Sequence, residues 1–142
     1  MPKKINIGDE WELDDNKRPT GRLLPIKPEI KKLTFDSIYA NDQPISVHTT
    51  IVANDQRTKS DYGAMISSED RKYKIIYELS ESYKHWMIYN GRGNEGYICI
   101  EPQTWMINAP NMERVGVKDS GLIEILPGAA RTDSTRIYII EK

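Results

Sequence analysis

The sequence is poor in the residues that build several common kinds of functional site. Its 142 residues include a single cysteine, Cys99, two histidines and one phenylalanine. One cysteine excludes an internal disulfide framework and a cysteine-based zinc cluster, and it indicates a reducing, cytoplasmic setting. Cys99 itself lies in the apolar run YICIE, where a small buried residue is expected.

Neither sign of charge is in excess. Lysine and arginine number 20, aspartate and glutamate number 21, and the net charge is −1. Broad electrostatic binding to nucleic acid or to an anionic membrane surface is therefore not expected. No apolar run approaches the roughly 20 residues that span a bilayer, and the first residues, MPKKINIGDEW, have no apolar stretch that would make them a signal peptide. The length predicts one soluble domain over residues 1–142.

Short runs of β-branched and aromatic residues, separated by turn-forming residues, predict an all-β fold. Strands are expected at Ile5–Leu13, Ser46–Ala53, Tyr62–Ser67, Tyr73–Leu79, Tyr83–Tyr89, Tyr97–Glu101, Leu122–Leu126 and Arg136–Glu141. The polar segment DDNKRPTGR is expected to be a turn, and the proline-containing segment Pro102–Asn111 a structured loop and not a helix. Strands at this spacing predict an antiparallel β-sandwich or barrel.

Signals for metal binding or nucleophilic catalysis are weak. His48 and His85 lie far apart in the sequence, and neither has the spacing of a metal motif such as HExxH. Each is expected to be a packed or surface side chain. The sequence has no G-x-S-x-G elbow, and the glycine-rich segment NGRGNEG is expected to be a hairpin loop. No metal and no cofactor are therefore expected.

The segment GYICIEPQTWMINAPN is the most informative part of the sequence. Glu101 ends an apolar strand and is followed by Pro102, so its carboxylate is expected at the start of a rigid loop, where it would suit general-base chemistry. Gln103 and Asn108 offer planar polar groups for sugar hydroxyls, and Trp105 offers a stacking face. The alternative is that Glu101 only ends a strand and Trp105 only packs.

This segment, followed by SGLIEILPG and the final strand STRIYIIEK, resembles the C-terminal end of the aldose 1-epimerases, the galactose mutarotase-like proteins. Upstream, WELDDNKRPTGRLLPI resembles a turn of the same family that contains Pro-Thr-Gly. The two motifs come in the family's order, and the resemblance extends from about Trp11 to the C-terminus. It implies an antiparallel β-sandwich that corresponds to the C-terminal half of a larger mutarotase-like supersandwich.

The resemblance also implies a reaction, the interconversion of the α and β anomers of a free aldose such as a hexose. A carboxylate takes the proton of the C1 hydroxyl, a histidine protonates the ring oxygen, and no cofactor is needed. Glu101 would be the general base and Asp36 would bind sugar hydroxyls, although the short match around Asp36 also fits Asp42. The family's catalytic histidines lie in its N-terminal half. The resemblance therefore does not assign the role of the acid to His48 or to His85.

The resemblance to only half of a family leaves three hypotheses open. The chain is a fragment that needs a complementary N-terminal-half polypeptide, a truncated product that folds alone or as an inactive homodimer, or a short sugar-binding domain that has lost the acid. A non-catalytic carbohydrate-binding sandwich would use Trp105, Tyr97, Trp86 and Tyr89 as its stacking surface. A purely structural domain would leave Glu101 exposed and salt-bridged, with no concave pocket beside it. Half a sandwich also leaves sheet edges open, which predicts a homodimer or a complex with another chain.

Overall fold

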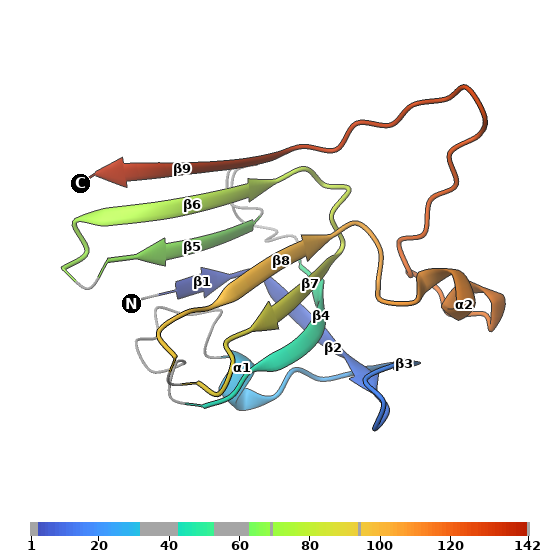
Figure 1. Cartoon of the computed structure of the whole chain (residues 1–142), viewed down its shortest axis with the longest axis horizontal. Helices are drawn as coiled ribbons and strands as arrows, with labels where there is room; N and C mark the ends of the chain where they lie inside the picture. Colours follow the sequence, from blue (N-terminus) through green and yellow to red (C-terminus); the bar gives the residue numbers. More distant parts are fainter. Residues whose placement is uncertain (1–2, 32–42, 53–62, 69, 94, 142) are drawn as a thin grey trace.

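The computed structural model describes residues 3–31, 43–52, 63–68, 70–93 and 95–141 (Figure 1). The strands are β1 (Lys3–Ile5), β2 (Ile7–Leu13), β3 (Pro19–Leu24), β4 (Ser46–Ile51), β5 (Gly63–Ser67), β6 (Tyr73–Leu79), β7 (His85–Tyr89), β8 (Cys99–Gln103) and β9 (Thr135–Glu141). Two short helices, α1 (Pro28–Lys31) and α2 (Ala109–Arg114), lie between strands. No helix in these described ranges is long and apolar enough to cross a membrane.

The strands form two sheets, and every neighbouring pair that the structure describes is antiparallel. The four-stranded sheet has the order β1-β5-β6-β9, and the five-stranded sheet has the order β3-β2-β4-β7-β8. Only Asn6 separates β1 from β2, so the first strand segment passes from one sheet directly into the other. The predicted all-β, antiparallel sandwich is confirmed.

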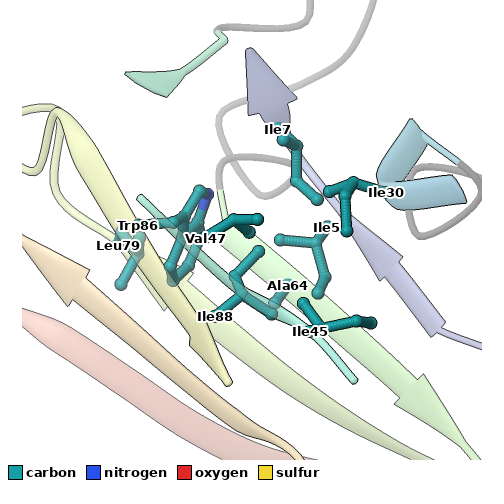
Figure 2. Close-up of a cluster of buried hydrophobic side chains, with 9 residues drawn as sticks. All are labelled: Ile5, Ile7, Ile30, Ile45, Val47, Ala64, Leu79, Trp86 and Ile88. Carbon is teal, nitrogen blue, oxygen red and sulfur yellow. The ribbon is translucent and has the colours of Figure 1, made fainter. Parts of the chain in front are cut away.

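The main core lies between the two sheets (Figure 2). Ile5 and Leu79 come from the four-stranded sheet, whereas Val47, Trp86 and Ile88 come from the five-stranded sheet, and all five are buried. Trp86 is the largest of them and is 0 % exposed, and its indole N–H donates to the carbonyl oxygen of Asn6 at 3.0 Å. The side chains that alternate with this core face on β4, β7 and β8 therefore lie on the opposite face of the five-stranded sheet, here called the outer face.

Two predicted elements are wrong. Leu122–Leu126 is not a strand, and Ile123, Ile125 and Leu126 are exposed, because no neighbouring strand in the described ranges pairs with this segment. The predicted loop Pro102–Asn111 contains the end of β8 and the start of α2, so Glu101 lies within a strand and not at its end, because Pro102 pairs with Trp86. A proline in the first turn does not oppose a helix, since the first N–H groups of a helix have no intrahelical partner, and Pro110 occupies such a position.

The Pro-Thr-Gly motif is also placed differently from the prediction. The turn is confined to Asp14–Arg18, which is closed by a hydrogen bond from the N–H of Asp14 to the carbonyl oxygen of Arg18 at 2.8 Å. Pro19 already belongs to β3, where it pairs with Leu13 next to an irregularity in the register. Proline has no N–H to donate to a neighbouring strand, so it is tolerated at the first position of an edge strand such as β3.

Candidate functional site

The register of β4, β7 and β8 brings chemically useful side chains to the outer face. His48 lies opposite Met87, which in turn lies opposite Glu101. One step along the sheet, His85 lies opposite Gln103. Partners in an antiparallel pair point to the same face, so both histidines share this face with the proposed general base.

His48 and His85 are packed side chains, 0 % and 1 % exposed, and neither lies on the surface. Although they are far apart in the sequence, their ring centroids are only 5.6 Å apart. His48 Nδ1 lies 3.1 Å from the carbonyl oxygen of Trp86, to which it donates, and His48 Nε2 accepts from the N–H of Ile107 at 3.1 Å. His85 Nδ1 accepts from the indole N–H of Trp11 at 3.1 Å.

These hydrogen bonds require both rings to be neutral. Nε2 of His48 and Nδ1 of His85 each accept a hydrogen bond, so neither atom carries a proton. Burial lowers the pKa of His48 to about 4, and burial together with the adjacent His48 ring lowers the pKa of His85 to about 4. Both histidines are therefore buried and neutral in this chain at pH 7.

The segment after β8 covers part of the outer face. Met106 and Ala109 pack with Trp11 in a second buried cluster, and Met112, Val117 and Leu122 lie against it. The N–H of Met106 also donates to the carbonyl oxygen of Ser120 at 2.7 Å, which closes the segment on itself. Together with the hydrogen bond from Ile107 to His48, these contacts fix the backbone that carries Trp105 and Asn108.

A pocket of about 560 Å³ lies along this fixed segment. Residues 102–110 form most of its lining, and Tyr83 and Asp133 complete it. Trp105 is 45 % exposed, so its ring is available to a ligand. The pocket thus combines an exposed indole with the polar side chains of Gln103, Thr104, Asn108 and Asp133.

Three of the five residues predicted from the sequence, Gln103, Trp105 and Asn108, meet in this pocket. Glu101 is exposed and lies outside its lining. It shares the face of β8 with Gln103, two residues away, which corresponds to about 7 Å along a strand. Asp36, and Asp42 as its alternative, lie outside the described residues.

The predicted aromatic stacking surface does not form as a unit. Trp86 belongs to the core and is 0 % exposed, so it is unavailable to any ligand. Tyr89 and Tyr97 are exposed and adjacent, with ring centroids 6.3 Å apart, but neither lines the pocket that contains Trp105.

Two further residues of the pocket, Tyr83 and Asp133, are not among those predicted from the sequence. Asp133 accepts a hydrogen bond from Arg131 Nε at 3.0 Å, and the hydrogen bonds from Ser82 and Arg131 lower the pKa of its carboxyl group. It is therefore a charged acceptor at neutral pH. No motif surrounds Asp133, and only the path of the chain after α2 brings it near residues 102–110, so no local pattern indicates its role.

Within the residues that the structure describes, no three His, Cys, Asp or Glu side chains are grouped in a way that could hold a metal ion. The described groups of the pocket can accept and donate hydrogen bonds and can stack on an apolar face of a ligand. A carboxylate, Glu101, lies nearby.

Comparison with solved structures identifies this architecture. The crystal structure of a galactose mutarotase-like protein from Clostridium acetobutylicum resembles this chain with a TM-score of 0.82 and 28 % sequence identity, over 99 % of this chain. The chain has a galactose mutarotase-like fold. It spans only 41 % of the length of the Clostridium protein, so the mutarotase-like fold is present here in part. No protein-family model matches the sequence.

Proposed function

We propose that this chain binds a free aldose in the pocket beside Trp105, as the sugar-binding part of an aldose 1-epimerase-like protein in which Glu101 is the general base. The observation that carries the proposal is the meeting of Gln103, Trp105 and Asn108 in one pocket, next to an exposed carboxylate, within a galactose mutarotase-like fold. The resemblance points to Glu101, and the chemistry of sugar binding points to Gln103, Trp105 and Asn108.

The pocket suits a monosaccharide in its chemistry. One face of a pyranose ring is apolar and stacks on an aromatic ring, and the exposed indole of Trp105 offers such a surface. The hydroxyl groups need donors and acceptors, which the amides of Gln103 and Asn108 and the carboxylate of Asp133 provide. The volume of about 560 Å³ lies within the range of about 300–1,000 Å³ typical of small-molecule sites.

Proton transfer in this proposal is incomplete without another group. Glu101 would take the proton of the C1 hydroxyl, but opening the ring also requires an acid at the ring oxygen. His48 and His85 are buried, and their acceptor nitrogens are already occupied by hydrogen bonds. The acid would therefore come from a complementary polypeptide that supplies further parts of a mutarotase-like protein.

Replacing Trp105 by alanine is expected to weaken aldose binding by about 10-fold or more, because the stacking face is lost. Isothermal titration calorimetry with D-galactose and D-glucose measures the affinity without relying on tryptophan fluorescence. Val115→Ala is the control, since Val115 is also an exposed apolar residue but does not line the pocket. Equal affinities for the wild type and Trp105→Ala would show that the sugar does not bind in this pocket.

The role of Glu101 is tested by polarimetry on freshly dissolved α-D-galactose. Any acceleration of mutarotation over buffer is expected to fall by about 10²-fold or more in Glu101→Gln, because the amide cannot act as the base. Aldose affinity should be retained, since Glu101 lies outside the pocket lining. Glu124→Gln, a change at another exposed glutamate, serves as the control. An acceleration that survives Glu101→Gln unchanged would exclude this residue as the base.

A second function, non-catalytic carbohydrate binding, is favoured by the position of Glu101 outside the pocket lining and by the burial of both histidines. It predicts the same loss of affinity in Trp105→Ala. It differs in predicting no mutarotation by the chain under any condition, including mixtures with other mutarotase-like polypeptides.

A further inference from the structure

Strand β9 forms an edge of the four-stranded sheet, with only β6 beside it among the described residues. Figure 1 shows it at the margin of the molecule, with nothing drawn beyond it. Ile137 and Ile139 point to the same face of the sheet as Tyr77 and Ile75 of β6, yet they are 64 % and 68 % exposed. The apolar face of this sheet thus extends beyond the part that the core covers.

The edge of β9 lacks most of the usual features that prevent strands from pairing with other chains. The seven residues TRIYIIE contain no proline and no lysine, and every position pairs regularly with β6. Its two charged residues, Arg136 and Glu141, lie towards the ends of the strand. A regular, exposed, apolar edge strand of this kind is a template for another strand.

The sequence of β9 is complementary to itself in one antiparallel register. When Tyr138 lies opposite Tyr138 of a second copy, all seven residues have a partner and Ile137 lies opposite Ile139. Thr135 then faces Glu141, whose carboxylate can accept from the threonine hydroxyl, and no like charges face each other. A slip of two residues in either direction pairs only five of the seven residues. In one direction Ile139 faces Ile139 but Ile137 faces Glu141, and in the other Ile137 faces Ile137 but Ile139 faces Thr135. In this register, residues that lie opposite each other point to the same face, so the core-side faces of the two four-stranded sheets lie on the same side of the combined sheet.

We propose that β9 pairs antiparallel with β9 of a second copy of this chain, about a two-fold axis at Tyr138, to form a continuous eight-stranded sheet. The pairing joins Ile75 and Ile139 of one copy to Ile137 and Tyr77 of the other in one apolar row across the interface. The inference does not depend on sugar binding, because no residue of β9 lines the pocket.

The test compares two double variants that differ only in the sign of one charge. In Ile137→Lys/Ile139→Lys, the proposed register sets lysine opposite lysine twice, whereas Ile137→Lys/Ile139→Glu sets lysine opposite glutamate twice. Both variants replace the same exposed residues, so the fold should tolerate them equally. Light scattering coupled to gel filtration, from micromolar to sub-millimolar protein, gives the mass, and circular dichroism verifies the fold.

The wild type is expected to reach twice the monomer mass of 16.4 kDa. The Lys/Lys variant should remain a monomer at concentrations at which the wild type is dimeric, and the Lys/Glu variant should recover the dimer. Amide hydrogen exchange on the unmodified chain gives a second readout, because protection of β9 should increase with protein concentration. A wild-type monomer throughout the range, a dimer in the Lys/Lys variant, or a complex in which a different polypeptide occupies the β9 edge would overturn the proposal.

Discussion

Acidification from pH 7 to about 4 is expected to lower the free energy of unfolding by about 3 kcal/mol for each of the two buried histidines. In the folded protein, burial holds the pKa of His48 and of His85 at about 4, whereas the unfolded chain has histidines with an ordinary pKa of about 6.5. Between these two values the unfolded state binds more protons. This contribution is therefore complete above pH 6.5 and is lost as the pH falls towards 4.

The geometry explains why protonation is costly. A proton on Nε2 of His48 would place a donor against the N–H of Ile107, and a proton on Nδ1 of His85 would place a donor against the indole N–H of Trp11. Two charged rings would also lie only 5.6 Å apart between their centroids. The positive charge of Lys84 also disfavours a proton on His85.

Urea unfolding at constant ionic strength, at a series of pH values between 4.5 and 7.5, measures this effect. His48→Gln is the informative variant, because glutamine offers a donor for the Trp86 carbonyl and an acceptor for the Ile107 N–H but does not titrate. Its stability should depend less steeply on pH than that of the wild type, and His85→Gln should behave alike. A wild-type stability that stays level from pH 7 to pH 5 would contradict the assignment.

Trp86→Ala is expected to destabilise the protein by about 3–5 kcal/mol, the usual cost of deleting a large aromatic side chain from a core. Trp86 is 0 % exposed and packs edge-on against Tyr77, with ring centroids 6.5 Å apart, so it connects the two sheets. Its loss would also leave the carbonyl oxygen of Asn6 without the indole donor at the point where β1 passes into β2.

Chemical denaturation of the two purified proteins gives the difference directly. Trp105→Ala provides a control with the same chemical change, and it should alter stability by less than about 0.5 kcal/mol because Trp105 is 45 % exposed. Similar losses in both variants would show that the core between the sheets is not where the stability lies.

The strands that the sequence predicts well are those with strong local patterns. Tyr73–Leu79 is found with the predicted bounds, and Ser46–Ala53 is found as Ser46–Ile51, because β-branched and apolar residues dominate both. Leu122–Leu126 has the same composition but forms no strand, since a strand also needs a neighbour and the described part of the chain offers none. Local pattern therefore predicts the capacity to form a strand, and the pairing decides whether it forms.

The residues of the candidate site also fall into two groups, those that a local pattern indicates and those that depend on distant segments. Gln103, Trp105 and Asn108 lie within six consecutive residues, so the end of β8 and the loop that follows bring them together and the sequence could indicate them. Asp133 and the contact between His48 and His85 depend on distant segments meeting in space. The register of β4 against β7 creates that histidine pair, and no spacing in the sequence encodes it.

The order of strands in the four-stranded sheet has a consequence during synthesis of the chain. β6 pairs with β9 along its whole length, but β7, β8 and α2 are made between them. About 55 residues separate Leu79 from Thr135, and at the usual rate of translation they take on the order of several seconds to appear. During that time the emerging chain presents β6 with one side of its backbone unpaired. The strand that pairs with this side of β6 is thus made well after β6 itself, and a chain released before Thr135 would keep the apolar edge of β6 open for as long as it existed.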